Sequence, residues 1–524
     1  MTEDIVNKTW DVIVVGTGMG GGTIGRRLAE KGLSVLYLER GPEGPRGEEQ
    51  SIDNGHHHDP AVRLTRGYWP KPMRADINGK SSEFFGPLGA GIGGTSVFYA
   101  ATLERPEIHD LQDSTERPHP TGGWPANYNS FQPYFEDAER MFQVSGDGDP
   151  LTSVSASALK TPPPLSEVDT ILMNTFRNKG LHPYRMHMGI KGLSDCRHCI
   201  GRKCPKTCKM DARSAGVEPA KATGRAAVLD YCQVIAFRGN REQITHIEAR
   251  HRSTILNLKA RRYILSAGAL GSPRLLLASA AEHWPQGCAN SSGLVGRNLM
   301  FHLNETIAIW PNRSVNSDGP SKAIALRDFY YRNGQRLGSF QAMGLDASYG
   351  NIVHYLNNVF DRSVMRDVKP LRQFTRVPAF IAARLLGNAK IFVGIIEDPP
   401  DEQNRVTLDE NDPEIIRFRY DIGPELLARR HLFRRVVKKA LRGQRFFFMN
   451  TAPELNFGHP CGTVRFGADP ATSVLDTSCR THDVKNLYVV DSSFMPTSCA
   501  VNPSLTIAAN ALRVADSLIA DLSR

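Results

Sequence analysis

The sequence predicts an α/β fold with more than one domain, and three observations support this prediction. An apolar strand, a glycine-rich turn, a helical stretch and a second apolar strand follow one another within residues 11–40. Another strand and a long helical stretch end the chain, within residues 487–522. The chain has 524 residues, which is too long for one compact core, so we expect two separate or two intertwined domains.

Composition and charge are those of a globular protein with a basic surface. Hydrophobic residues make up 40% of the chain and charged residues 23%, and the formal net charge is +10. A basic surface suits nucleic acid, anionic lipid or an acidic partner protein. Because lysine and arginine are scattered over most of the chain, we favour a dispersed, solvated charge and expect no nucleic-acid partner.

The apolar segments of the chain lead to an expected location. The first ten residues, MTEDIVNKTW, carry acidic side chains and lack the apolar core of an export signal. No uncharged apolar run reaches the ~18 residues that span a bilayer. The nearest run, AFIAARLLGNAKIFVGII, is interrupted by Arg384 and Lys390. We therefore expect a cytoplasmic protein without a transmembrane segment, and we leave export with a partner subunit open.

The N-terminal segment DVIVVGTGMGGGTIGRRLAEKGLSVLYLERG has the pattern of a dinucleotide-binding unit. The predicted strands are Val12–Val15 and Val35–Leu38. In such a unit the first glycine permits the turn, the second lets the main chain approach a pyrophosphate, and the third lets the helix pack close to the sheet. A carboxylate at the end of the second strand accepts hydrogen bonds from ribose hydroxyls. The residues in these positions are Gly16, Gly18, Gly21 and Glu39. The motif alone leaves FAD and NAD open.

Two central segments are also rich in glycine. GPLGAGIGGTSVFYAATLER holds a glycine cluster that lets the main chain pass close to a flat or charged group, although a loop crossing between domains would have the same composition. RRYILSAGALGSPRLLLAS predicts a strand, Tyr263–Ala267, that breaks at Gly268 and Gly271. We expect a helix to resume after Pro273, because proline is well tolerated in the first turn of a helix.

The C-terminal segment NLYVVDSSFMPTSCAVNPSLTIAANALRVADSLIADL predicts a last strand and helix. The strand, Leu487–Val490, ends in Asp491, and the helix begins at about Ser504. Its apolar spacing turns Ile507, Leu512 and Val514 inward. We expect this piece to rejoin the N-terminal nucleotide-binding domain.

Together these segments resemble the glucose–methanol–choline (GMC) oxidoreductases over nearly the whole chain. The resemblance rests on the N-terminal pattern, the GGTS segment, GALGSPRLLLAS, VGRNLMFHL, and the pair HPCGTVRFG and VVDSSFMPTSCAVNPSLTIAA. It implies FAD, oxidation of an alcohol, and an α/β fold in which a Rossmann-like FAD-binding domain is interleaved with an α+β substrate domain built on an antiparallel sheet. The implied FAD-binding segments are 1–110, 191–300 and 456–524, and the implied substrate segments are 111–190 and 301–455.

The resemblance also implies the residues of the active site. By motif, His459 and Asn502 face the flavin ring where the alcohol binds. An imidazole titrates near pH 6.5, so His459 can accept the hydroxyl proton while a hydride moves to flavin N5, and Asn502 can orient the alcohol oxygen. The implied FAD-binding residues are Gly16, Gly18, Gly21, Glu39, Gly93, Gly94, Thr95, Ser96, Gly268, Asp491, Asn502 and Pro503.

The way in which the flavin is held is a separate expectation. Some relatives bind FAD covalently through a histidine shortly after the GGTS-type loop. Phe98 stands at the corresponding position here, so we predict a non-covalent flavin.

A cysteine cluster, CRHCIGRKCPKTC, remains outside these motifs and permits three hypotheses. A reduced or disulfide-bonded structural cluster is the first, and zinc bound by four thiolates is the second. The third is an iron–sulfur cluster, because the C-x4-C-x3-C spacing resembles a segment of multi-subunit, FAD-dependent sugar dehydrogenases of the same family. Such a cluster would pass electrons to an external carrier, which favours a dehydrogenase over an oxidase. The four thiols are Cys196, Cys199, Cys204 and Cys208.

A basic segment, LLARRHLFRRVVKKALRGQRFFF, has apolar residues at helical spacing. A basic amphipathic helix can bind a membrane or an acidic electron carrier. A surface helix of the substrate domain has the same pattern, and we favour that interpretation.

The leading functional hypothesis is oxidation of a sugar or glycoside hydroxyl, with electrons passed to an external acceptor such as a carrier protein or a small partner subunit. An oxygen-using alcohol or sterol oxidase is the first alternative. A lyase of the same fold, which binds flavin without net redox chemistry, is the second. Bleaching of the flavin by an alcohol without oxygen distinguishes the redox enzymes from the lyase.

Overall fold

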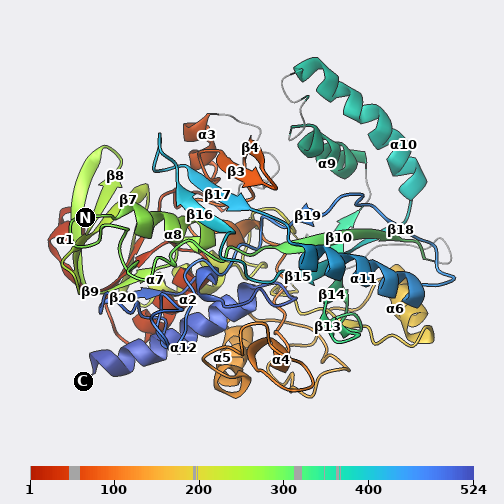
Figure 1. Cartoon of the computed structure of the whole chain (residues 1–524), viewed down its shortest axis with the longest axis horizontal. Coiled ribbons are helices and arrows are strands. Elements are labelled where there is room, and N and C mark those ends of the chain that lie inside the picture. The colour runs from red at the N-terminus through yellow and green to blue at the C-terminus, as the bar shows by residue number, and fades with distance from the viewer. Residues whose placement is uncertain are drawn as a thin grey trace.

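Two seven-stranded sheets organise the computed structural model, one on each side of the molecule (Figure 1). The structure describes residues 2–46, 59–192, 196, 199–311, 322–346, 349–361, 365 and 368–523. Chain segments from both termini and from the middle contribute to the first sheet, so the sequence order of the elements differs from their spatial order. The α/β prediction, with an antiparallel sheet beside a Rossmann-like unit, is confirmed.

The first sheet contains the predicted dinucleotide-binding unit. Its strands are β1 (Thr9–Val15), β2 (Val35–Leu38), β6 (Ala226–Leu229), β7 (Cys232–Gly239), β8 (Ile244–His251), β9 (Thr254–Leu265) and β20 (Leu487–Val489). The strands β6, β2, β1, β9 and β20 run parallel to their neighbours. A meander of β7 and β8 extends this sheet antiparallel from the start of β9. Because β20 pairs with β9, the C-terminal strand returns to the N-terminal sheet, as predicted.

The helices of this half bury their apolar sides as the sequence pattern predicts. The helix α2 (Met19–Glu30) buries Ile24 and Leu28 completely. The C-terminal helix α12 (Ser504–Leu522) packs on α2 and on α5 (Tyr128–Met141), and its predicted inward residues are all buried. The two ends of the chain are therefore joined in one core.

The helix after β9 differs from the prediction. The strand β9 ends at Leu265, and α8 (Gly268–Ala278) begins at Gly268, so the helix includes Pro273 instead of starting after it. Proline has no N–H to donate to the carbonyl four residues earlier, which would leave Ala269 O unpaired. The hydroxyl of Thr463 donates to that carbonyl at 2.7 Å. A distant side chain thus replaces the lost helix hydrogen bond.

The second sheet is antiparallel and has helices on both faces. Its strands are β5 (Tyr184–Arg185), β10 (His302–Ile309), β11 (Ile324–Leu326), β14 (Gly338–Asp346), β15 (Lys390–Glu397), β18 (Phe446–Phe448) and β19 (Glu454–Leu455). One face packs against α6 (Glu167–Asn178) and α11 (Pro424–Ala440), where Phe176 meets Phe392 edge-on at 5.7 Å. The other face packs against α9 (Tyr349–Asp361) and α10 (Arg376–Leu386).

The basic segment forms α11, a covering helix of the second sheet, in agreement with the interpretation we favoured. It buries Phe433 and Val437 against the sheet. Two of its cations are also buried and paired with carboxylates of the sheet: Arg430 contacts Glu305, and Arg429 Nη1 lies 3.6 Å from Glu397 Oε2. These two charges therefore form ion pairs within the protein and are not exposed on its surface.

A smaller sheet joins segments that the sequence assigned to different domains. Its strands are β3 (Met73–Ile77), β4 (Lys80–Phe84), β16 (Arg405–Leu408) and β17 (Ile416–Tyr420). Here β3 pairs in parallel with β17. The predicted domain boundaries therefore stay predictions. The short remaining α-helices and strands are α1 (Thr2–Asn7), α3 (Pro60–Thr65), α4 (Ile108–Leu111), α7 (Glu218–Ala222), β12 (Tyr331–Arg332) and β13 (Gln335–Arg336).

The apolar run that came nearest to a membrane span is divided in the structure. Its first part belongs to α10 and its second part to β15, with Gly387 between them. Among the described residues, no helix combines the length and the apolar character that crossing a membrane requires.

Candidate active site

The glycine turn between β1 and α2 opens onto a cavity. Gly16 has φ +94°, and a Cβ at Gly21 would stand 2.1 Å from Gly16 O, so the turn and the close helix both require glycine. A Cβ at Gly18 would meet nothing within 4 Å, although Gly18 lines the cavity. The start of α2 therefore presents bare main chain to the cavity, as an anion site at a helix N-terminus requires.

Glu39 lies at the end of β2, on the wall of the same cavity. Its carboxylate accepts hydrogen bonds from Thr17 N at 3.2 Å, Thr17 Oγ1 at 2.5 Å and Gly41 N at 3.2 Å. Burial raises the pKa of Glu39, and the hydrogen bonds from Thr17 and Gly41 oppose that rise. The carboxylate is thus held at the predicted ribose position by the glycine turn itself.

Segments from the middle and the end of the chain complete the wall. Gly93 N donates to Thr17 Oγ1 at 3.1 Å, which ties the GGTS loop to the glycine turn. Asp491 accepts hydrogen bonds from Gly268 N at 3.0 Å and from Ser272 Oγ at 2.5 Å, which ties the C-terminal segment to the start of α8. Burial raises the pKa of Asp491.

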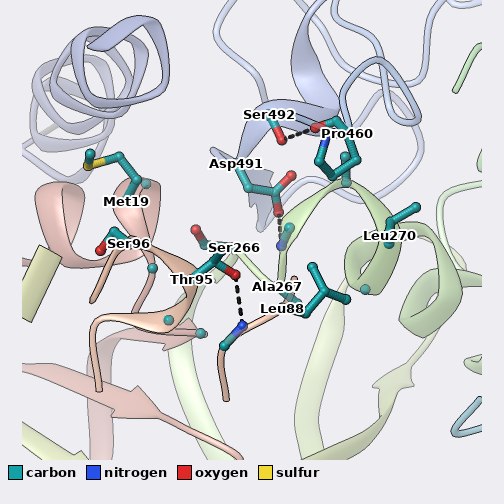
Figure 2. A pocket seen from close by; sticks show the side chains of 18 of the residues that line it. Met19, Leu88, Thr95, Ser96, Ser266, Ala267, Leu270, Pro460, Asp491 and Ser492 are labelled. Carbon is teal, nitrogen blue, oxygen red and sulfur yellow. Dashed lines mark hydrogen bonds between the residues drawn. The ribbon is translucent and has the colours of Figure 1, made fainter. Parts of the chain in front are cut away.

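Most of the predicted FAD-binding residues line this one cavity, whose volume is about 400 Å³. Figure 2 shows Thr95 and Ser96 from one segment, Ser266 and Ala267 from a second and Asp491 from a third around the pocket. The predicted residues on its wall are Gly16, Gly18, Glu39, Gly94, Thr95, Ser96, Gly268, Asp491, Asn502 and Pro503, together with His459. Gly21 and Gly93 are not among the lining residues, and they act on the packing behind the wall.

Five buried polar atoms of cavity-lining residues lack a hydrogen-bond partner in the described part of the chain. They are Arg40 Nη1, Trp69 Nε1, Ser266 Oγ, Arg274 Nε and Asn502 Oδ1. The Arg40 guanidinium also lies over the Trp69 ring, 4.3 Å from its centroid. Buried polar groups are normally paired, so this set indicates a bound molecule with several polar groups. The residues present therefore fit the predicted FAD.

His459 and Asn502 meet at the wall of the cavity, although 43 residues separate them in the sequence. His459 follows β19 in an irregular loop, and Asn502 precedes α12. The distance from Asn502 Nδ2 to His459 Nε2 is 3.4 Å. Burial, followed by the charges of His302 and Lys322, lowers the pKa of His459 well below 6.5. His459 is therefore a neutral imidazole at neutral pH.

A second histidine, His302, indicates which ring nitrogen of His459 carries the proton. Burial lowers the pKa of His302 to about 4, so this ring is neutral and carries one N–H. Its Nε2 lies 2.6 Å from the carbonyl oxygen of Cys499, which only a donor can approach so closely. His302 Nδ1 is then an acceptor, so its 2.9 Å contact with His459 Nδ1 favours the tautomer with the proton on His459 Nδ1, although Asn456 Nδ2, a donor, also lies 3.1 Å from that nitrogen. The hydrogen-bond network thus leaves a lone pair on His459 Nε2, facing Asn502.

Sequence reasoning did not single out His302, although it quoted the segment VGRNLMFHL that contains it. It also missed Asn456, whose Nδ2 lies 3.1 Å from His459 Nδ1 and donates to Asn304 Oδ1 at 3.3 Å. A histidine in a family motif was an available signal for His302. Nothing in the sequence pointed to Asn456.

The four predicted thiols lie close to one another, beside the GGTS loop. Burial raises the pKa of Cys208 to about 12, and neighbouring Cys196 and Cys204 contribute to that rise. Burial and Cys204 likewise raise the pKa of Cys199. All nine cysteines are described and are free thiols. No group of three or more His, Cys, Asp or Glu residues is arranged to hold a metal ion within the described residues, so the structure does not support the predicted metal site.

Comparison with known proteins gives a consistent result. The two GMC oxidoreductase family models match residues 10–304 and 400–511. Paromamine 6'-oxidase from Streptomyces fradiae is 27% identical, over 98% of this chain and 92% of that protein. The fructose dehydrogenase large subunit from Gluconobacter japonicus is 25% identical, over 98% of both chains. The crystal structure of pyridoxine 4-oxidase from Mesorbium loti superposes with a TM-score of 0.64 at 19% identity, over 97% of this chain and 99% of that one.

The matched family segments together span most of the chain and include both halves of the active site. The N-terminal match contains the glycine turn, Glu39 and His302, and the C-terminal match contains His459 and Asn502. The cavity that these segments enclose fits FAD. The chain therefore belongs to the GMC oxidoreductase family, and it is an FAD-dependent oxidoreductase that acts on CH–OH groups.

Proposed function

We propose that this oxidoreductase converts a hydroxyl group of a sugar or glycoside to a carbonyl, with His459 as the general base. The observation that carries the proposal is the lone pair assigned to His459 Nε2, 3.4 Å from the Asn502 amide at the cavity wall. The substrate class is supported by two similar proteins, one named for fructose and the other for paromamine.

The proposed reaction removes one hydride and one proton from the alcohol. FAD, when bound, supplies the hydride acceptor. His459 Nε2 accepts the hydroxyl proton as the carbon–oxygen double bond forms. Asn502 cannot exchange protons, so its amide holds the alcohol oxygen in place. His302 keeps the His459 proton on Nδ1 and so keeps the other nitrogen available as the base.

In the proposed FAD site, main-chain groups bind the phosphates and a side chain binds the ribose. The amides at the start of α2 hold the pyrophosphate, and Glu39 accepts from the ribose. We propose that the flavin is non-covalent, because Phe98 has no nucleophilic atom and its ring stacks on Tyr68 at 4.9 Å. After acid precipitation, the yellow colour should stay in the supernatant. A yellow pellet would contradict this proposal.

Two hypotheses describe how the reduced flavin passes on its electrons. In the first, an iron–sulfur cluster on Cys196, Cys199, Cys204 and Cys208 passes electrons to a carrier protein or partner subunit. Its support is the sequence spacing and the closeness of the thiols. In the second, the cysteines are structural and oxygen or a small acceptor reoxidises the flavin directly. The absence of a metal-ligand arrangement among the described residues favours the second.

Iron and acid-labile sulfide analysis of anaerobically purified protein separates these hypotheses. The first requires both elements, and Cys204→Ser should then remove iron and slow turnover with a cytochrome while an alcohol still bleaches the flavin. Iron-free protein with full turnover would contradict the first hypothesis and support the second, in which the cysteines are structural.

An anaerobic screen of sugars, glycosides, sterols and simple alcohols tests the main proposal. A sugar or glycoside should bleach the flavin fastest. Faster bleaching by a sterol or an aliphatic alcohol would contradict the substrate class. No bleaching by any of them would favour the lyase alternative.

A further inference from the structure

The helices α9 and α10 form an arm on the second sheet. They project from the second sheet at the upper right of Figure 1, and a 3-10 helix, Lys369–Thr375, lies between them in the sequence. Most of the exposed large hydrophobic side chains of the described residues lie in this arm. The arm is not part of the proposed active site, since none of its described residues lines the cavity.

The outer face of α10 is more apolar in character than its inner face. Phe374 just before the helix is 67% exposed, and Leu385, Val377, Phe380 and Ile381 are 66%, 60%, 53% and 53% exposed. The inner face packs mainly against α9, and its residues in that apolar cluster are Leu386 and three alanines, Ala379, Ala382 and Ala383. A helix that faces water normally has the opposite arrangement, with large apolar residues inside. The outer face therefore fits an apolar environment.

Every charged residue of the chain segment that contains α10, from Val368 to Ile396, is basic. The chain carries Lys369, Arg372, Arg376, Arg384 and Lys390 between Val368 and Ile396, and no Asp or Glu. Arg376 and Arg384 are exposed on α10, and the Arg384 guanidinium lies 4.8 Å from the centroid of the Phe380 ring. Apolar side chains among arginines complement a surface that is apolar inside and anionic outside.

We propose that the outer face of α10 docks on an anionic lipid bilayer. The helix has 11 residues, which corresponds to about 16 Å, roughly half of the ~30 Å hydrocarbon core. It therefore lies in the plane of the interface, with Phe380, Ile381 and Leu385 among the acyl chains and the arginines at the phosphates. A second copy of this chain fits less well, because a two-fold contact would set the same arginines against each other.

Vesicle co-sedimentation with the FAD-loaded protein tests this proposal. Vesicles of phosphatidylcholine mixed with phosphatidylglycerol should bind at least about tenfold more tightly than phosphatidylcholine alone, because each surface cation adds to the attraction. Phe380→Ser with Ile381→Ser should weaken binding to the mixed vesicles by about tenfold or more. Arg376→Gln with Arg384→Gln should remove the preference for the anionic lipid.

The matched control is Ile255→Ser. Ile255 is 52% exposed, close to Ile381, but it lies on β9, far from α10 (Figure 1). This variant should bind vesicles like the parent, and FAD content and melting temperature should show that every variant is folded. Equal binding to both vesicle types, or full binding by the Phe380 and Ile381 double variant, would overturn the proposal. So would a dimer in solution that this double variant abolishes, since the face would then belong to a second copy.

Discussion

The two walls of the cavity are built by different means. The wall at the start of α2 is main chain: Gly16 and Gly18 line the cavity, and Gly21 lets the helix pack close behind them. The second wall is made of the side chains of His459 and Asn502, and His302 contacts His459 from behind it; the three residues come from three distant segments. The first wall should therefore govern whether FAD is held, and the second should govern how fast an alcohol reduces it.

Among the substitutions that test this difference between the walls, we expect the largest effect, a loss of bound FAD, at Gly18. In Gly18→Val the side chain would enter the space where the pyrophosphate approaches the main chain, so we expect loss of FAD. The control is Gly423→Val. Gly423 also precedes a helix, and its φ of −67° matches the −66° of Gly18. A Cβ added at Gly423 would also meet nothing within 4 Å, but Gly423 does not line the cavity. The absorbance of purified protein measures the result, and a full complement of FAD in Gly18→Val would place the phosphates elsewhere.

A smaller effect is expected at His302, which contacts His459 from behind the second wall. In His302→Phe the N–H at His459 Nδ1 loses its buried acceptor, which costs about 1–3 kcal/mol and corresponds to a roughly tenfold to hundredfold slower flavin reduction. FAD should be retained. The variant His302→Gln offers a carbonyl oxygen to the same N–H and should recover much of the rate. An unchanged rate in His302→Phe would remove His302 from the positioning of the base.

The pH profile of flavin reduction tests the protonation state of the base. The base is the neutral form of His459, and burial lowers the pKa of His459 well below 6.5, so the neutral form persists as the pH falls through 6.5. Anaerobic stopped-flow rates should therefore stay level near pH 6.5 and fall only in more acidic solution. A loss of rate centred on pH 6.5 would indicate an ordinary, solvated histidine.

The smallest effect is expected at Lys322. Its charge contributes to the lowered pKa of His459, after burial and His302. Burial lowers the pKa of Lys322 itself to about 7, so the ammonium is present in the acidic range where His459 titrates. In Lys322→Met the acid limb of the rate profile should move toward higher pH, with FAD content unchanged. A shift in the other direction would mean that Lys322 does not repel the imidazolium.

How far the sequence predicted the molecule depends on the range of the interactions. The glycine turn, Glu39 and the inward face of α12 were predictable, because neighbouring residues determine them. The predicted start of α8 was wrong. A rule based on the local proline could not include the hydrogen bond that the distant Thr463 hydroxyl donates to Ala269 O. The contacts of His302 were not predictable, because its partners, His459 and Cys499, lie more than a hundred residues away in the sequence.

The second wall makes the central claim testable with one substitution. In His459→Ala the protein should retain FAD, and dithionite should still bleach it. The best alcohol from the anaerobic screen should reduce the flavin at least about a hundredfold more slowly than in the parent, because the positioned proton acceptor is gone. Flavin reduction by that alcohol at the parent rate would show that His459 is not the base.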